Sequence, residues 1–263
     1  MHLKRLFIAA ILLPLLYWYV RYLPVQYFLF LLGSISFIAM TEFYSMYRVY
    51  GFFRYICLLL GTSLIAVSAY APDLMVKFLA LSVMAVFASR LIVKKTPLSS
   101  LNDIAAPVVG LLSIPLFLSF QTYLRELGPE WIIFLYATVW SADSFAYYIG
   151  KGIGKKKLYP EVSPNKTVAG AVGSLIGGTS GALLLKILIV PQLGMYHAVM
   201  IGIMVGIISI IGDLIESMFK RDAGVKDSSI IIPGHGGILD KIDGALFAGP
   251  LLYSVLKIFG MIH

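Results

Sequence analysis

The sequence predicts an all-α polytopic membrane protein with about nine transmembrane helices and a cytoplasmic N-terminus. Of its 263 residues, 59% are hydrophobic and only 13% are charged, whereas a soluble domain is about half apolar and a quarter charged. The mean hydropathy is +0.89. Apolar stretches of about 20 residues recur along the chain, and each is long enough to cross a bilayer. Because lipid offers peptide groups no partner, these stretches must form helices and cannot form an open sheet.

The first expected span follows a basic start and resembles a signal peptide. No small-residue cleavage site follows it, so we expect a retained helix. The sequence Ala71-Pro72-Asp73 separates the third span from the fourth, since proline marks a helix break. The expected spans are residues 3–22, 25–46, 52–71, 73–93, 103–124, 130–150, 168–190, 194–219 and 238–260.

The positive charges indicate the orientation. With nine spans, sixteen of the 21 Lys and Arg residues lie on the side of the N-terminus and five on the other. Cytoplasmic loops carry the excess of Lys and Arg. Both long polar loops, 151–167 and 220–237, therefore face the cytoplasm. The net charge of +8 is spread over short loops, so nucleic acid is not an expected partner.

The polar residues divide the chain into two expected regions. Residues 1–127 form N-terminal transmembrane helices that serve as scaffold and lipid-facing surface, and residues 128–263 form a C-terminal transmembrane catalytic region. Glu42 is an acidic exception in the first region, and its simplest interpretation is a carboxylate at the cytoplasmic interface. Cys57 is the single cysteine, which excludes an intramolecular disulfide and a cysteine metal cluster.

Four acids flank the last loop. Asp213 and Glu216 are three residues apart, as are Asp240 and Asp243, so each pair occupies one helix face. If the two faces meet beneath the membrane surface, their oxygens suit Mg²⁺. The alternative is that Asp240 and Asp243 only favour the N-terminal end of a helix dipole.

Asp143 is a carboxylate within an expected span, with Ser141 and Ser144 beside it. Ionisable residues inside a membrane usually mark a functional site and have a partner. Asp143 is therefore a candidate catalytic residue. The alternative is a structural ion pair with a lysine of a neighbouring loop.

The loop 151–167 ends in a candidate phosphate site. Ser163, Lys166 and Thr167 offer donors just before an expected helix, and a helix N-terminus attracts anions. The lysine run Lys155–Lys157 is weaker evidence, because such runs often contact anionic lipid.

The loop 220–237 holds the remaining candidates. Its basic residues suit a triphosphate, since arginine can grip phosphate oxygens in pairs. His235 is either a phosphate ligand or proton carrier, or only a cap for the loop. Gly236 and Gly237 offer backbone amides without side chains beside a helix start. The basic residues are Lys220, Arg221 and Lys226.

Gly173, Gly177 and Gly181 form a small-residue face on the span 168–190. Such a face predicts close helix packing, either within the fold or between the subunits of a homodimer.

The segment Ser217–Asp243 resembles the signature of the phosphatidate cytidylyltransferases, or CDP-diacylglycerol synthases. An Arg of that signature is replaced by Lys241. The segments 143–150 and 163–167 also resemble the family, so the specific likeness covers roughly the C-terminal half. The matching positions are Ser217, Lys220, Arg221, Lys226, Asp227, Ser229, Pro233, His235, Gly236, Gly237, Asp240 and Asp243.

This resemblance implies that the cytidylyl group of CTP is transferred to phosphatidate with Mg²⁺, giving CDP-diacylglycerol and pyrophosphate; whether a second cation joins the Mg²⁺ is left open. It implies an integral protein of the bacterial inner membrane with a cytoplasmic active site. The expected metal ligands are Asp213 and Asp240; the expected catalytic residues are Lys226, Asp227, Asp243 and Asp143; the expected substrate contacts are Ser163, Lys166, Thr167, Ser217, Lys220, Arg221, His235, Gly236 and Gly237.

Two other functions fit the same residues. An enzyme with a different lipid acceptor, such as a polyprenol kinase or an isoprenoid-ether-lipid cytidylyltransferase, needs the same cations and acids. A cation-coupled secondary transporter also needs intramembrane acids, but such transporters usually show repeats and interrupted helices near mid-membrane. Here the polar residues gather at one face, which favours an enzyme at the membrane surface.

Overall fold

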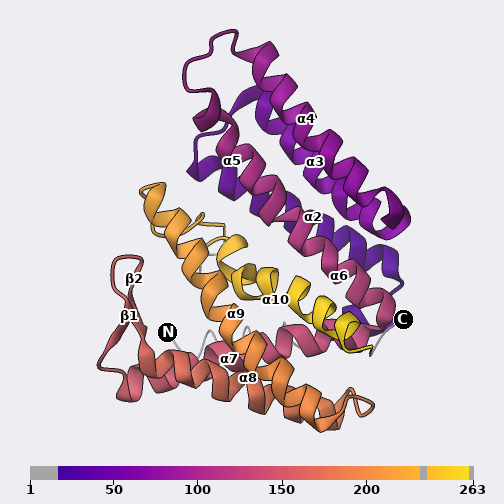
Figure 1. Cartoon of the computed structure of the whole chain (residues 1–263), viewed down its shortest axis with the longest axis vertical. Coiled ribbons are helices and arrows are strands. Elements are labelled where there is room, and N and C mark those ends of the chain that lie inside the picture. Colours follow the sequence, from indigo (N-terminus) through magenta and orange to yellow (C-terminus); the bar gives the residue numbers. More distant parts are fainter. Residues whose placement is uncertain (1–16, 232–235, 261–263) are drawn as a thin grey trace.

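The computed structural model describes residues 17–231 and 236–260, which are helical apart from short connections and one β hairpin (Figure 1). The elements of the first half are α2 (Val25–Met46), α3 (Gly51–Tyr70), the 3-10 turn η1 (Pro72–Leu74), α4 (Met75–Val93), α5 (Ser100–Ser113) and α6 (Pro115–Leu127). Those of the second half are α7 (Pro129–Ile153), β1 (Lys157–Tyr159), β2 (Ser163–Thr167), α8 (Val168–Leu188), α9 (Met195–Asp222) and α10 (Leu239–Ile258).

Proline sets several of these boundaries. Pro72, Pro115 and Pro129 each open an element, because proline lacks an N–H and its ring fits only the first helical turn. Gly128, with φ at 144°, separates α6 from α7. The expected span 103–124 is thus two helices, α5 and α6, since Pro115 interrupts the hydrogen bonding that a single helix requires.

Seven helical stretches in the described part of the chain are long and apolar enough to cross a membrane. They correspond to the second through eighth expected spans and confirm an all-α membrane protein. The ninth, α10, has 20 residues but carries four charged side chains. Most of the first expected span, 3–22, lies outside the described residues. Nine spans and a cytoplasmic N-terminus therefore stay predictions.

The helices form two groups with α9 and α10 between them (Figure 1). Helices α7 and α8 run side by side and pack on α9, while α2, α3 and α6 lie on the other side and α10 contacts both groups. The hairpin, the C-terminal end of α9 and the N-terminal end of α10 meet at one end of the molecule, at the left in Figure 1. The polar residues of the second half are thereby collected at this end.

The glycine face of α8 packs inside the fold. A Cβ on Gly173 would meet the carbonyl oxygen of Phe145, and one on Gly177 would meet that of Ser141. Both partners belong to α7, so the missing side chains let the two helix backbones approach closely. Packing within the fold is the alternative that this geometry supports; a homodimer stays a prediction.

Large apolar side chains cover the outward surfaces of the helices. Phe30, Val76, Leu91 and Ile187 are all more than 60% exposed. A soluble monomer rarely exposes so much contiguous apolar surface, whereas hydrocarbon is a good solvent for it. The chain is therefore an integral membrane protein.

Candidate active site

Three carboxylates from two helices converge at the polar end of the molecule. Asp213 and Glu216 come from α9 and Asp243 comes from α10, and one oxygen of each lies within 4.8 Å of the others. The spacing of three residues places Asp213 and Glu216 on the same face of α9. The sequence predicted that acids of the last two helices meet here, but Glu216 was not among its expected ligands.

Asp240 lies beside this cluster and is engaged elsewhere. Its Oδ1 is 2.6 Å from Lys220 Nζ. Its Oδ2 accepts hydrogen bonds from the Ser228 backbone N–H at 2.9 Å, the Ser228 hydroxyl at 2.7 Å and the Gly237 N–H at 2.8 Å. Asp240 thus satisfies one backbone donor of the loop after α9 and one just before α10. Its role as a metal ligand stays a prediction, since the three-carboxylate cluster forms without it.

Lys220 lies between acids of both helices. Its ammonium is 2.5 Å from Glu216 Oε2 and 2.6 Å from Asp240 Oδ1. All three side chains are at least 90% buried, so the charges depend on one another for stabilisation. Helix α9 runs to Asp222, so Lys220 and Arg221 belong to its last turn and not to the expected loop 220–237.

A cavity of about 660 Å³ opens beside the carboxylates. Its size is that of a site for a small molecule or cofactor. The walls come from α7, the hairpin, α8, α9 and α10, so the fold brings together residues up to 100 positions apart in the chain. The acids on its wall are Asp143, Asp213, Asp240 and Asp243.

The expected loop 151–167 contains the β hairpin. Helix α7 continues to Ile153, and β1 and β2 pair antiparallel with Lys157 opposite Thr167. Lys166 Nζ is 2.6 Å from Asp213 Oδ2. The Thr167 hydroxyl accepts from the Gly170 N–H at 3.0 Å and caps α8. The hairpin therefore holds Lys157 and Lys166 on the cavity wall, with Thr167 at the helix start.

Asp143 has a hydroxyl partner. Ser209 of α9 donates a hydrogen bond to Asp143 Oδ1 at 2.7 Å. Both residues line the cavity. The structure thus supports a carboxylate at a polar site more than an ion pair with a loop lysine.

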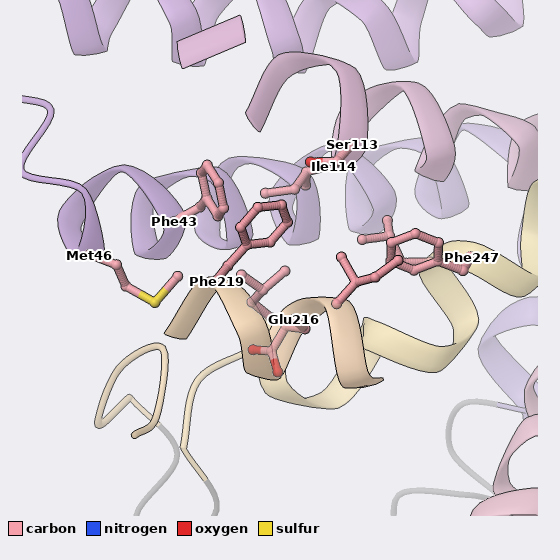
Figure 2. A pocket seen from close by; sticks show the side chains of 10 residues that line it. Phe43, Met46, Ser113, Ile114, Glu216, Phe219 and Phe247 are labelled. Carbon is pink, nitrogen blue, oxygen red and sulfur yellow. The ribbon is translucent and has the colours of Figure 1, made fainter. Parts of the chain in front are cut away.

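Apolar side chains shield one side of Glu216. Figure 2 shows Phe43, Phe219 and Phe247 gathered on that side, while the Glu216 carboxylate points away from their rings. Phe43 and Phe219 contact edge to face with ring centroids 5.5 Å apart. The void among these residues is about 20 Å³, which is room for about one water molecule. Little solvent therefore reaches the Glu216 carboxylate from this side.

The carboxylate cluster fits a hard divalent cation. Both Glu216 oxygens are buried without a hydrogen-bond partner among the described residues, and an ion pair to Lys220 is their close contact. Like charges at this separation repel, and buried anions need a cation. Carboxylate oxygens from two helices are ligands that Mg²⁺ accepts together with substrate phosphates.

The sequence also matches a known protein family. The model of the cytidylyltransferase family matches residues 3–259. This chain belongs to that family.

Curated cytidylyltransferases share close similarity with part of the chain. It is 40% identical to the phosphatidate cytidylyltransferase of Bacillus subtilis over 136 residues, which are 52% of this chain and 51% of the relative. It is 44% identical over 132 residues to the proteins of that name from Brucella abortus, with 50% and 48% covered, and Staphylococcus saprophyticus, with 50% and 51% covered. The chain thus spans about half the length of the curated relatives it matches.

Several predicted site residues lie away from the cavity wall. Lys226 and Asp227 are exposed. Arg221 donates from Nε to the Val162 carbonyl at 3.3 Å and from Nη1 to the Val225 carbonyl at 3.0 Å, which ties the hairpin to the loop after α9.

Others lie near the wall without lining it. Ser163 belongs to β2 and faces Tyr159 across the hairpin. Ser217 is buried and donates to Asp213 Oδ1 at 3.3 Å. Gly236 has a positive φ of 86°, which glycine adopts without strain. His235 lies outside the described residues.

Proposed function

We propose that this chain transfers the cytidylyl group of CTP to phosphatidate, giving CDP-diacylglycerol and pyrophosphate. A phosphate oxygen of phosphatidate attacks the α-phosphorus of CTP and forms a new P–O bond. The bond from the α-phosphorus to the oxygen that bridges it to the β-phosphate breaks, and pyrophosphate leaves. The attacking phosphate is already ionised, so the reaction needs alignment and charge neutralisation more than a strong base.

The observation that carries this proposal is one cavity whose wall combines carboxylates and lysines. Asp213 and Asp243 supply anions, and Lys157 and Lys166 supply cations, beside the N-terminal end of α8. A nucleoside triphosphate with its metal needs both signs of charge. A cavity lined by one sign would bind only one of these components.

Asp213, Glu216 and Asp243 would hold the divalent cation. When bound, Mg²⁺ would neutralise phosphate charge in the transition state. Asp240 keeps Lys220 and the start of α10 in position, and it lines the same cavity. Asp240 as a further metal ligand, which the sequence predicts, is also part of this proposal.

The hairpin and α7 would bind the phosphates. Lys166 lies next to Asp213, and Lys151 and Lys157 also line the cavity. Each lysine acts as a point charge. The Thr167 hydroxyl caps α8, so Thr167 would shape the phosphate site. Backbone amides at the start of α8 would contact the phosphates.

The excess of Lys and Arg in the loops on the side of the N-terminus supports a cytoplasmic active site. The bacterial relatives support a place in the inner membrane of a bacterium. CTP is a cytoplasmic metabolite, and the lipid headgroup can enter from the bilayer while its acyl chains remain in hydrocarbon. Five further residues remain candidate substrate or catalytic residues: Lys226, Asp227, Ser163, Arg221 and His235.

The test is turnover by the purified protein in detergent. CTP and phosphatidate are incubated with Mg²⁺, and both pyrophosphate and the lipid product are measured. We expect stoichiometric formation of the two products, dependence on both substrates, and loss on EDTA addition. Asp213→Asn should abolish turnover, while Asp73→Asn, an exposed acid of η1, should not.

The alternatives are separate outcomes of the same assay. Turnover with another lipid phosphate but not phosphatidate would identify a different acceptor. Transfer of a single phosphoryl group with release of CDP would indicate a lipid kinase. Absence of any CTP-dependent product, with cation-driven uptake in vesicles, would indicate a transporter and overturn the proposal.

A further inference from the structure

Glu42, near the end of α2, is bound to the loop that follows α9. Its side chain is only 2% exposed. Oε1 accepts from the Ser229 hydroxyl at 2.6 Å and the Ile238 N–H at 3.0 Å. Oε2 accepts from the Ser228 hydroxyl at 3.0 Å and the Leu239 N–H at 2.9 Å. Glu42 is therefore buried against this loop, and its expected place at the cytoplasmic interface stays a prediction.

These four contacts require a carboxylate. Each oxygen faces two donors, and an ionised carboxylate is an acceptor only, with about four lone-pair positions. A glutamine of the same shape would direct its NH₂ group at one pair of donors. An aspartate would be one methylene too short to reach all of them. Both the charge and the length of glutamate are therefore needed to accept all four hydrogen bonds.

Ser228 connects Glu42 to the candidate active site. Its hydroxyl oxygen is 3.0 Å from Glu42 Oε2 and 2.7 Å from Asp240 Oδ2. A hydroxyl has one proton to donate, so the two carboxylates share it. Asp240 also accepts from the backbone N–H groups of Ser228 and Gly237. Glu42 and Asp240 therefore each bind residues at both ends of the loop, Ser228 at one end and residues 237–239 at the other.

The fit around Gly237 is tight. A Cβ at this position would meet the Ser228 hydroxyl and both oxygens of Glu42. The loop backbone therefore lies directly against the two side chains, with no space for a water molecule between them.

We infer that Glu42 is a positioning residue for the cytidylyltransferase site, one that fixes residues 228–229 after α9 and residues 237–239 at the start of α10 and thereby orients Asp240 and Lys220 beside the cavity. The inference rests on the proposed function of this site. All four donors to Glu42 belong to these two short stretches. The N-terminal helices thus contribute to the active site, although the sequence assigned them a scaffold role.

The test compares Glu42→Gln with Arg90→Gln. Arg90 is also buried in the N-terminal half, but its guanidinium binds Asp103 and the carbonyls of Thr96 and Leu98, away from the cavity. Both variants should unfold at a lower temperature. Only Glu42→Gln should speed hydrogen exchange at the amides of residues 237–239, measured by mass spectrometry without CTP or metal.

The kinetic readout separates positioning from folding. Outer-shell partners of a metal site typically contribute 10–100-fold in metal affinity or activity. We expect Glu42→Gln to raise the Mg²⁺ concentration for half-maximal turnover by about tenfold or more, and Arg90→Gln to leave it unchanged. Ser229→Ala, which removes one donor to Glu42, should give a smaller shift in the same direction.

Each outcome decides the inference. Equal exchange at residues 237–239 in both variants, with an unchanged Mg²⁺ requirement, would overturn it. If Glu42→Gln does not fold, Ser229→Ala must show faster exchange at Ile238 and Leu239, or the inference fails. A wild-type protein without turnover on phosphatidate would remove the proposed function, while the exchange experiment would still report whether Glu42 holds the loop.

Discussion

Lys220 and Asp240 form a buried ion pair, with Nζ and Oδ1 2.6 Å apart, that joins the last turn of α9 to the first turn of α10. Glu216 takes the other side of the ammonium at 2.5 Å. Helix α9 carries two acids of the candidate metal cluster and α10 carries the third. The ion pair therefore fixes the spacing of the ligands as well as the two helix ends.

Lys220→Met should abolish turnover and lower the stability of the folded protein. Taking one partner from a buried ion pair costs about 3–5 kcal/mol, because the remaining charges are left without compensation. We expect a lower thermal midpoint in detergent and loss of CTP turnover. Lys257→Met, at the exposed far end of α10, is the matched control and should change neither. Equal midpoints for the two variants would contradict the prediction.

Adding Asp240→Asn to Lys220→Met should restore part of the lost stability, since the pair is then neutral on both sides. Turnover should stay absent, because the charge that orients the start of α10 is gone. A double variant no more stable than Lys220→Met would show that the ion pair itself contributes little.

Glu216→Gln should weaken metal activation although Glu216 was not an expected ligand. Its carboxylate lies within 4.8 Å of Asp213 and Asp243. Outer-shell partners of a metal contribute about 10–100-fold in metal affinity or activity, so we expect the loss of a direct ligand to raise the Mg²⁺ concentration for half-maximal turnover by at least about tenfold. Glu161→Gln, on the exposed turn of the hairpin, should behave as wild type. A normal Mg²⁺ response in Glu216→Gln would leave Asp213 and Asp240 as the better ligand pair.

Lys166→Met should weaken CTP binding. Hydrogen bonds to charged groups contribute about 1.5–3 kcal/mol, so removal of one phosphate contact should raise KM for CTP by about tenfold or more. The effect should shrink at high salt. The control is Lys155→Met, which changes an exposed lysine outside the cavity wall. Similar KM values for both variants would show that the lysines act only through overall charge.

Gly177→Ala should destabilise the contact between α7 and α8. The added Cβ would lie 2.6 Å from the Ser141 carbonyl oxygen, and overpacking of this kind costs about 1–3 kcal/mol. Gly152→Ala is the matched control, because nothing lies within 4 Å of its Cβ position. Thermal unfolding should separate the two, with Gly152→Ala equal to or above wild type.

The sequence predicted much of the fold because the bilayer restricts the possibilities. The span 25–46 coincides with α2, and the spans 130–150 and 168–190 end within three residues of α7 and α8. The helix break at Pro72 was predicted, whereas the break at Pro115 was missed. The hairpin from Lys157 to Thr167 was not, since two short polar strands have no apolar periodicity to indicate them.

The sequence predicted which helices carry the candidate site, but not which of their side chains are in contact. Spacing placed Asp213 and Glu216 on one face of α9, yet only the packing of α10 shows that Asp243 meets them while Asp240 turns to Lys220. Glu42 had no local signal of its role, because its donors lie 186 to 197 residues further along the chain.

The sequence by itself determined that the chain crosses a membrane, where most helices begin and end, and which end holds the charges. These properties follow from apolar length and local backbone chemistry. The tertiary structure alone decided which carboxylates converge, which cation lies between them, and how Glu42 reaches the loop. Those are distances between separate helices, and they depend on glycine contacts and side-chain packing that no local pattern records.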